Sequence, residues 1–400
     1  MTVTSSLIAV WEANHFLNFV GLIFVPIGLL SGVLGWSATA VFALNFCAII
    51  PLAKVLDYAT DQLSMRVGDT VGGLLNASFG NAVELIMALT ALNNGLFDVV
   101  KASVVGSILS NLLLVLGLCF LCGGLFPFQH NQHQTFDSDK ASVSTGLLAL
   151  TLVGYLVPSA MKWYLESVGG YNKDIESATV LNISRGISVL LLLTYAGYLL
   201  FHLYTNPDGL LRGHSDAEAG SSKTLAGNEE DEDQDEEPET LLWVALAALA
   251  ASTLVIVLCA DLLVGSIEGI AKEIRLSEAF VAIILLPIVG NAAEHLTAVS
   301  SAMRDKLDLS IQVAVGSAHQ ISLFVGPLVV LMGWWMDKGL DLDLGVFSLA
   351  SLFVSVLVVN SVMADGKTHW YEGWLLLCGY LMISIGFWCQ PAASAAGSAI

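Results

Sequence analysis

The sequence predicts an all-α polytopic membrane protein, built as one N-terminal helix followed by two inverted-topology repeats of five helices each. Three observations lead to this fold class. The 400 residues are 56% hydrophobic and only 12% charged, with a mean hydropathy of +0.75, whereas soluble domains carry about 25% charged residues. Apolar stretches of membrane-spanning length recur along the whole chain. A short polar motif also occurs twice, at equivalent places in the two halves.

Eleven apolar stretches are long enough to cross a bilayer, since a spanning helix needs about 20 mostly apolar residues. They are expected at residues 17–35, 38–57, 71–93, 99–124, 141–161, 183–205, 241–265, 279–302, 309–334, 344–363 and 370–389. The connections are short except for residues 206–240. We therefore expect an N-terminal segment with the first helix (1–37), a first five-helix repeat (38–205), a polar loop (206–240), and a second five-helix repeat with a short tail (241–400).

Much of the formal net charge of −20 comes from the polar loop, where Glu229–Glu237 reads EEDEDQDEE. Charge runs of this kind are usually solvated linkers, and we interpret this one in that way. The alternative is an antenna that attracts cations, or a regulatory sensor at the mouth of a transport pathway. Lys and Arg are spread almost evenly over the two sides, so the positive-inside rule assigns no orientation.

The two halves carry the same motif at a shift of 210 residues. Gly80–Glu84 reads GNAVE and Gly290–Glu294 reads GNAAE, and the same shift relates Gly106-Ser107 to Gly316-Ser317. Five spans per half is an odd number, so the second half must enter the membrane upside down. Inverted repeats are typical of secondary transporters, which hold their substrate near the midplane between the repeats.

The repeated glutamates predict the chemistry. A charged carboxylate at a helix centre costs about 2.5–3.5 kcal/mol on insertion scales, and Glu84 and Glu294 both incur this cost. Inverted symmetry would bring the two carboxylates face to face, where they repel unless protons or a cation neutralise them. Competition between protons and a divalent cation for one site is the basis of a cation/proton antiporter, with about two protons suiting one ion.

Oxygen ligands surround these glutamates and suit Ca²⁺, Mg²⁺ or Mn²⁺. The Asn residues lie three positions before each glutamate, on the same helix face, and the Gly residues four positions before permit unwinding that frees carbonyls. The predicted metal ligands are Glu84, Glu294, Gly80, Gly290, Asn81, Asn291, Ser107, Ser317 and Gln320, with Asn111 as a further polar residue that could complete the cage. His295 is either a proton relay beside Glu294 or a core histidine. The same two interpretations apply to His319.

Plainer interpretations remain open for single residues. Asn and Ser in spanning helices are often packing contacts, and GNA alone is compatible with a close helix crossing. No resident cofactor and no nucleic-acid partner are expected; the partners are Ca²⁺, protons and membrane lipid. Gly28-x-x-x-Gly32 in the first helix is a candidate dimer contact, so a homo-oligomer is left open.

Long stretches of the chain resemble a known family. TVGGLLNASFGNAVELIMALTAL and PIVGNAAEHLTAVSSAMRDKLDLSIQVAVGSAHQISLFVGPL are similar to the two repeat motifs of the calcium/cation–proton exchanger (CAX) family within the cation/calcium exchanger superfamily. The resemblance runs from about residue 17 to 390 and is nearest to fungal-type vacuolar Ca²⁺/H⁺ exchangers. It also covers SILSNLLLVLGLCFLCGG, the SRG at Ser184–Gly186 and ADGKTHWYEG.

The resemblance implies an antiporter that exports cytosolic Ca²⁺, and sometimes other divalent cations such as Mn²⁺, against protons. It implies that the acidic loop is cytosolic and that the predicted ligands named above match the family's ion-binding and proton-binding positions, with His295 at a histidine common in the second motif. The membrane would be vacuolar, or the plasma membrane if the protein is bacterial. Two departures stand out: Ala59–Leu63 reads ATDQL where the family usually reads ATEEL, and His319 replaces a small or apolar residue.

Three other functions compete with this interpretation. A Na⁺/Ca²⁺ exchanger has the same fold, but the counterpart of Asn111 is Ile321, which removes one polar ligand and favours protons. An intramembrane enzyme is disfavoured because HExxH, a serine nucleophile motif and paired intramembrane aspartates are absent from the sequence. A channel is disfavoured because buried paired acids in inverted repeats are typical of alternating access.

Overall fold

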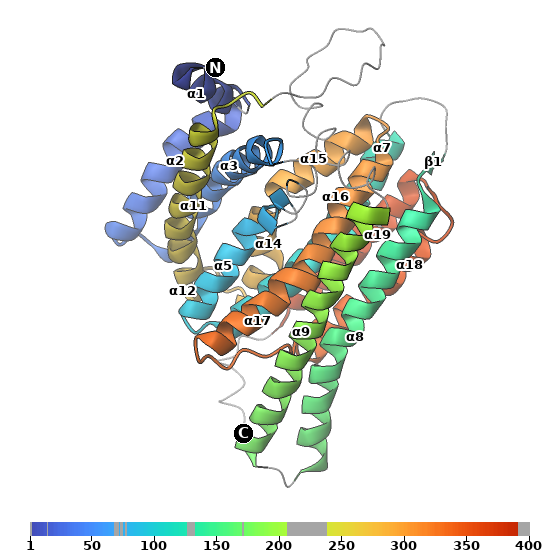
Figure 1. Cartoon of the computed structure of the whole chain (residues 1–400). Coiled ribbons are helices and arrows are strands. Elements are labelled where there is room, and N and C mark those ends of the chain that lie inside the picture. The colour runs from blue at the N-terminus through green and yellow to red at the C-terminus, as the bar shows by residue number, and fades with distance from the viewer. Residues whose placement is uncertain are drawn as a thin grey trace.

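The computed structural model describes residues 2–13, 15–67, 72, 75–76, 78–125, 133–169, 172–205 and 238–390, and these form a helical bundle (Figure 1). The helices of the first half are α1 (Val3–Glu12), α2 (His15–Val33), α3 (Ala38–Ser64), α5 (Ala82–Asn93), α6 (Phe97–Leu109), the π-helix η1 (Ser110–Val115), α7 (Leu116–Leu125), α8 (Ser138–Val168) and α9 (Lys173–Thr205). Those of the second half are α11 (Leu242–Gly265), α12 (Ile267–Ile274), α13 (Glu278–Phe280), the π-helix η2 (Val281–Leu285), α14 (Leu286–Gly290), α15 (Ala292–Met303), α16 (Leu307–His319), the π-helix η3 (Gln320–Val325), α17 (Gly326–Trp335), α18 (Val346–Val362) and α19 (Trp370–Trp388). Two short antiparallel strands, β1 (Gln134–Thr135) and β2 (Lys367–Thr368), pair at one end.

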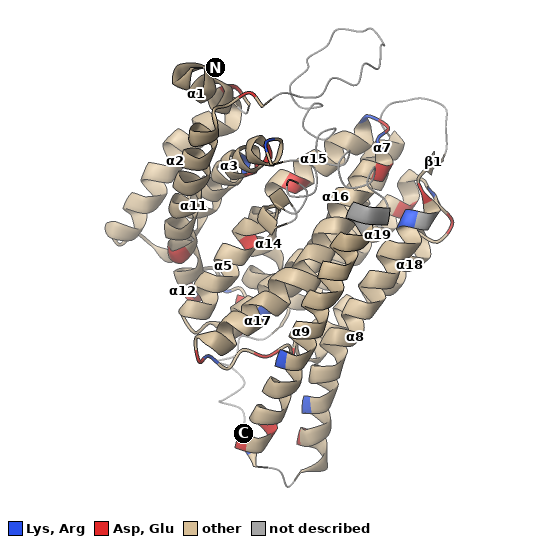
Figure 2. Cartoon of the chain, viewed as in Figure 1, with Lys and Arg blue, Asp and Glu red and all other residues tan. Residues whose placement is uncertain are grey.

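The helical membrane fold predicted from the sequence is confirmed, while the count of eleven spans stays a prediction. Among the described residues, seven helices are long and apolar enough to cross a membrane, or eight if the bent pair 278–303 forms one span. Helices α5 and α18 are apolar but shorter. Figure 2 shows Lys, Arg, Asp and Glu mostly near helix ends and in connections, with few on the helices between them; charged side chains are costly in a bilayer.

The internal repeat extends to the bounds of the elements. A shift of 210 residues carries α5 onto α15, α6 onto α16, η1 onto η3, and α7 onto α17. In all four pairs the numbers of the first and last residues differ by this shift. A π-helix is rare and occurs mostly as a local bulge at functional sites. Its occurrence at the same place in both repeats, three residues after the Ser of each Gly-Ser pair, indicates that the bulge belongs to the repeated unit.

The two repeats run in opposite directions through the bundle. Helix α5 ends beside the connection at residues 336–345, where Lys338 Nζ donates hydrogen bonds to the carbonyl oxygens of Leu92 and Asn93. Helix α15 ends at the opposite side, where the Ala302 carbonyl lies against Gly123 near the end of α7. We call the side of residues 238–241 the linker side and the side of residues 336–345 the far side. The motif helix thus ends at the far side in the first repeat and at the linker side in the second.

Helices α2, α3 and α11 pack together at one edge of the bundle (Figure 1). A Cβ atom at Gly28 would lie 3.0 Å from Asn45 Oδ1 of α3, and one at Gly32 would overlap with Leu262 of α11. The small residues of the Gly28-x-x-x-Gly32 motif therefore serve close packing inside the chain. Both glycines of the candidate dimer contact are packed against helices of the same chain, and a homo-oligomer stays a prediction.

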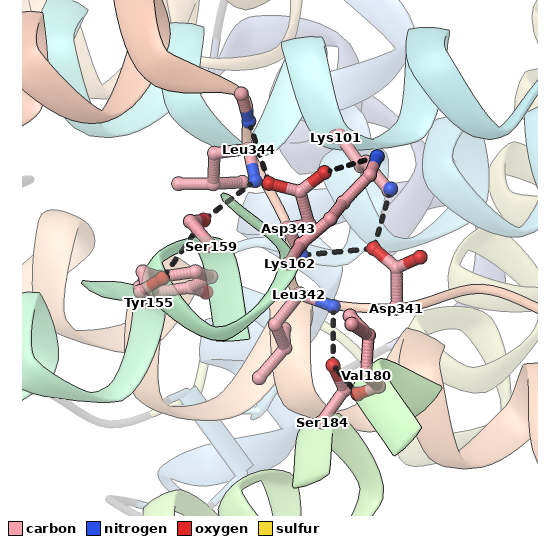
Figure 3. Close-up of polar contacts among 11 residues, drawn as sticks. Lys101, Tyr155, Ser159, Lys162, Val180, Ser184, Asp341, Leu342, Asp343 and Leu344 are labelled. Atoms are coloured by element: carbon pink, nitrogen blue, oxygen red, sulfur yellow. Dashed lines mark hydrogen bonds and ion pairs between the residues drawn. The ribbon is translucent and has the colours of Figure 1, made fainter. Parts of the chain in front are cut away.

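The connection at residues 336–345 fastens several helices together at the far side (Figure 3). Lys101 of α6 pairs with Asp341 at 2.5 Å, and Lys162 of α8 pairs with Asp343 at 2.8 Å. In the same segment, the backbone N–H of Leu342 donates to Ser184 Oγ of α9 and that of Leu344 donates to Ser159 Oγ of α8. Four helices of the first repeat are thus held to the second repeat when the Lys338 contacts to α5 are included.

Several bounds differ from the predicted ones because an apolar window detects only the part of a helix that lies in lipid. Helices α8 and α9 have 31 and 33 residues, longer than the 20 or so needed to span, and their ends carry polar residues. The two helices protrude together from the far side (Figure 1).

Helices α1 and α12 were not predicted. Helix α12 packs on the start of α3, where the Glu273 carboxylate accepts hydrogen bonds from Thr39 Oγ1 and from the backbone N–H groups of Ala38 and Thr39. The hydrogen bond from the Thr39 hydroxyl is the main cause that lowers the pKa of Glu273.

Candidate ion-binding site

The repeated motif interrupts its helix at the residues that the glycines predict. In the second repeat α14 ends at Gly290 and α15 begins at Ala292, with a bend of 63° between the two segments. In the first repeat α5 likewise begins at Ala82, directly after Asn81. Each break leaves helix-terminal N–H and C=O groups without partners in their own helix. Such half-helix ends are the usual ion and substrate contacts of inverted-repeat transporters.

The break brings the glutamate of one repeat against the motif of the other. Glu84 lies in the first turn of α5 and Glu294 in the first turn of α15. A Cβ atom built on Gly290 would lie 2.5 Å from Glu84 Oε1 and 2.9 Å from its Cδ, so the Glu84 carboxyl group rests directly on the Gly290 backbone. The two repeats therefore meet at their glutamate motifs, as inverted symmetry predicts.

Amide and hydroxyl side chains connect the two repeats beside the glutamates. Asn81 donates a hydrogen bond to Gln320 Oε1 and accepts one from Ser317 Oγ at 3.1 Å. Asn111 donates to Ser317 Oγ at 3.0 Å and to Asn291 Oδ1 at 3.4 Å. Each of these bonds joins residues of different repeats. The network holds the oxygen atoms of both motifs around one point near the centre of the bundle.

Three buried oxygens at this point have no hydrogen-bond partner among the described residues. They are Glu84 Oε1, Glu294 Oε2 and Asn111 Oδ1. A buried polar atom without a partner is costly, and native proteins keep such atoms mainly for a function or a ligand. A cation bound between the two motifs would give such oxygens a partner, and a proton would satisfy either carboxylate. No cluster of three or more His, Cys, Asp or Glu side chains suited to a metal occurs in the described part of the chain, so the cation would rely on two carboxylates plus amides and carbonyls.

A cavity of about 110 Å³ leads from the linker side to Glu294. Its walls come from α3, α9, α15, α16 and η3, and it includes Asp57 and Asp61 of α3, together with Gly316 and Ser317. We place the cavity on the linker side from its residue Asp61, whose neighbour Gln62 accepts a hydrogen bond from the backbone N–H group of Thr240. This volume has room for several water molecules, which offers water a route to Glu294 from the linker side.

The far side of the site is closed in this structure. Glu84 is only 6% exposed and borders a separate space of about 10 Å³, at the limit for a single water molecule. Farther out, Asn94 Nδ2 at the end of α5 donates a hydrogen bond to Asp261 Oδ1 at the end of α11. The structure thus shows one of the two states that alternating access requires, open to the linker side and closed to the far side.

The structure brings most of the predicted ligands together. Gly80 lies 3.5 Å from Gln320 Oε1, measured from a Cβ atom built on the glycine. Ser107 borders the small space at Glu84 rather than the amide network. The predicted residues that meet at the cross-repeat contacts described above are Glu84, Gly290, Asn81, Asn291, Ser317 and Gln320, while Glu294 lines the cavity that reaches them. Their role as ligands stays a prediction.

The two histidines lie away from the carboxylates. The His295 side chain faces η1, where its Nε2 is 3.5 Å from Ser110 Oγ, and it is not among the residues that line the cavity. His319 is fully buried, with Nε2 2.8 Å from the Ser144 carbonyl oxygen and its ring 5.8 Å from that of Tyr198. His319 therefore packs between α8 and α9.

Sequence reasoning placed too little weight on two groups. Asn111 joins Asn291 to Ser317 and is fully buried, although it has no polar counterpart in the second repeat. Its position in the bulge η1, next to the Gly-Ser pair, is the signal that could have identified it. Lys54 and Asp57 lie 3.7 Å apart at the cavity and Lys54 Nζ is 3.4 Å from Thr297 Oγ1; only their helical spacing on α3 could have predicted this.

Gln62, the amide in the ATDQL departure, holds the end of the linker. Its Oε1 accepts hydrogen bonds from the backbone N–H groups of Glu239 and Thr240 and from Thr240 Oγ1. Arg66 donates to the Thr240 carbonyl oxygen. An amide oxygen makes these three contacts as a carboxylate would, and Gln62 thereby anchors α3 to the start of the second repeat.

Broken, symmetry-related helices with paired buried carboxylates define an ion-exchanger membrane protein with inverted repeats. The family model described as "Sodium/calcium exchanger protein" matches residues 37–204 and 244–388, which are the two halves on either side of the linker. The chain belongs to this family.

Individual relatives cover nearly the whole chain. The "Ca(2+)/H(+) antiporter" of Aphanothece halophytica is 40% identical over 377 residues, which are 94% of this chain and 97% of that protein. The "Vacuolar calcium ion transporter" of Schizosaccharomyces pombe is 41% identical over 92% of this chain and 84% of its own. The solved structure of native YfkE superposes with a TM-score of 0.74 at 33% identity and covers 94% of this chain and 100% of its own.

Proposed function

We propose that this protein is a secondary antiporter that exchanges cytosolic Ca²⁺ for protons by alternating access. The observation that carries the proposal is the pair of symmetry-related glutamates, each with a buried, unpartnered oxygen. Glu294 lines the cavity on the linker side, and Glu84 borders the small space on the closed side. The names of the relatives, a Ca²⁺/H⁺ antiporter and a vacuolar calcium transporter, support Ca²⁺ and protons as the exchanged ions.

The proposed cycle starts from the conformation described above, with the linker side facing the cytosol. Ca²⁺ passes Asp57 and Asp61 at the cavity and binds between Glu84 and Glu294, since Ca²⁺ takes six to eight oxygen ligands at about 2.3–2.6 Å. The remaining oxygens come from Asn81, Asn291, Ser317, Gln320 and the carbonyls freed at the two helix breaks. Mn²⁺ fits the same donor set, because it also prefers oxygen.

Protons take the place of the cation when the site faces the other side. In an acidic compartment both carboxylates become protonated, which removes the charge that held Ca²⁺ and releases the ion. The protein then turns the site back toward the cytosol in its neutral, protonated form. Turning it back with two unpaired carboxylates in the membrane interior would be costly. Two carboxylates suit two protons per Ca²⁺. His295, next to Glu294 in sequence, is a candidate relay for these protons.

We assign the protein to a vacuolar membrane, or to a plasma membrane if the source is bacterial, as the compartments of its relatives suggest. Uptake of ⁴⁵Ca²⁺ into sealed vesicles, acid inside and with the linker side outward, tests the coupling ion. Uptake that collapses with a protonophore supports proton exchange. Uptake that ignores the pH gradient but follows an outward Na⁺ gradient would replace the proposal by Na⁺/Ca²⁺ exchange, and rates far above carrier turnover would indicate a channel.

A further inference from the structure

The Gly-Ser pairs of the two repeats are equivalent in sequence but differ in their surroundings. Gly106 of α6 and Gly316 of α16 are related by the 210-residue shift. Gly106 is buried, and a Cβ atom built on it would overlap with the Ile283 carbonyl oxygen and lie 2.7 Å from Pro287 Cγ. Among the described residues, a Cβ atom on Gly316 would find nothing within 4 Å, and Gly316 itself is partly exposed. The first glycine is sealed against η2 and α14, and the second lies open.

This difference follows the side on which the protein is open. Gly316 lines the water-accessible cavity that reaches Glu294 from the linker side. The positions around Gly106 border the tight space at Glu84 on the closed side, which is lined by Ser103, Ser107 and Pro287. On the far side, α6 therefore packs directly against the backbone of η2 at Gly106. Only a glycine permits so close an approach.

Inverted repeats alternate access by rocking or gating of one repeat against the other around a fixed site, and their symmetry allows the two halves to exchange surroundings. In the opposite state Gly316 becomes the packed glycine on the closed linker side, and Gly106 becomes the open one. We propose that Gly106 and Gly316 are paired packing contacts that alternate, each allowing the closure of one side of the pathway. The inference rests on the proposed function only in assuming alternating access, not in the ion that is carried.

Single alanine substitutions at the two glycines should then have opposite effects. The Cβ atom of Gly106→Ala would overlap with a backbone carbonyl in the conformation seen here, so this variant should disfavour the state open to the linker side. The Cβ atom of Gly316→Ala is accommodated in this conformation but would meet the equivalent obstacle in the opposite one. Gly316→Ala should therefore favour the state open to the linker side.

Ser103 and Val313 offer matched reporters, because they are related by the same shift and border the two spaces. We would introduce Ser103→Cys or Val313→Cys and measure labelling by a membrane-impermeant thiol reagent, applied from the far side and the linker side respectively, during turnover. The rate without the reporter cysteine is subtracted. Gly146→Ala of α8, where a Cβ atom also meets no described residue within 4 Å, controls for the general preference of helices for alanine.

Gly106→Ala should reduce labelling of the Val313 reporter and raise that of the Ser103 reporter, each by about fivefold or more, as an overpacked contact implies. Gly316→Ala should reduce labelling of the Ser103 reporter by a similar factor. Unchanged labelling in Gly316→Ala, or shifts in the same direction for both variants, would overturn the inference. If Gly106→Ala does not fold, Gly316→Ala alone decides. Labelling reports the open side whatever ion is carried, so an absence of Ca²⁺ uptake in the wild type would refute the proposed function separately.

Discussion

Gly290 has no side chain at the place where the Glu84 carboxyl group lies, and this contact predicts unequal roles for the two motif glycines. A Cβ atom at Gly290 would lie 2.5 Å from Glu84 Oε1 and 3.1 Å from Met87 Cε. A Cβ atom at the equivalent Gly80 would be 3.0 Å from the Asn76 carbonyl oxygen and 3.5 Å from Gln320 Oε1. The Cβ position of Gly290 thus overlaps with the carboxyl group of a proposed ligand, whereas that of Gly80 lies at an ordinary contact distance from another, Gln320.

The substitution Gly290→Ala should displace the Glu84 carboxyl group. Real Cβ atoms essentially never approach another heavy atom closer than 3.0 Å, so the carboxylate must retreat by at least about 0.5 Å, and by nearly 1 Å for a relaxed contact. A misplacement of about 1 Å at a reacting centre can cost up to 100-fold. We therefore expect the apparent KM for Ca²⁺ to rise at least about tenfold, and less than about threefold for Gly80→Ala.

The assay is the initial rate of ⁴⁵Ca²⁺ uptake into sealed, acid-inside vesicles as a function of Ca²⁺ concentration, normalised to the amount of folded protein. Gly80→Ala serves as the matched control, because it makes the same chemical change at the symmetry-related position. A wild-type KM in Gly290→Ala, or a larger loss in Gly80→Ala than in Gly290→Ala, would refute the placement of Glu84 at the ion.

Three further predictions concern the ion pair, the linker anchor and proton competition. Burial raises the pKa of Asp343, but the hydrogen bond and charge of Lys162 lower it overall, so the pair stabilises the protein above the ordinary aspartate pKa and loses this effect as the pH falls through the lower folded value. Lys162→Met should cost about 1 kcal/mol at neutral pH, and a thermal-unfolding difference that does not shrink at low pH would contradict this. Gln62→Leu should destabilise by about 1–3 kcal/mol because the N–H groups of Glu239 and Thr240 lose their acceptor, whereas Gln62→Glu should unfold close to the wild-type temperature; equal effects would contradict the anchor. Acid on the linker side should raise the KM for Ca²⁺ by competition, and a pH-independent uptake curve would exclude shared occupancy.

The sequence predicted the part of the fold that depends on local pattern. The helix breaks at Gly80–Asn81 and Gly290–Asn291 follow from glycine and asparagine in an apolar helix, and the shift of 210 residues correctly related four pairs of elements. The motif residues could be paired across the repeats because inverted symmetry is a strong constraint.

The remainder depends on tertiary packing that no local pattern encodes. Gln62 was recognised only as a departure from a family pattern, since its partners lie 177 and 178 residues away. Gly28 and Gly32 suggested a contact with another chain, although α3 and α11 occupy them. Asn111 breaks the repeat symmetry, so a search for symmetric residues undervalued it. Which side is open cannot be derived from two equivalent motifs, because both conformations share one sequence.

The measurement that tests the central claim most directly is Ca²⁺-driven proton movement in liposomes, recorded together with ⁴⁵Ca²⁺ uptake, for wild type, Glu84→Gln and Glu294→Gln. Glutamine keeps the size of each side chain but neither binds a proton nor carries charge. We expect coupled proton and Ca²⁺ movement in the wild type, and loss of both in each variant with unchanged thermal stability. Retained, proton-coupled Ca²⁺ transport in both variants would contradict the assignment of these two carboxylates as the shared site of cation and proton.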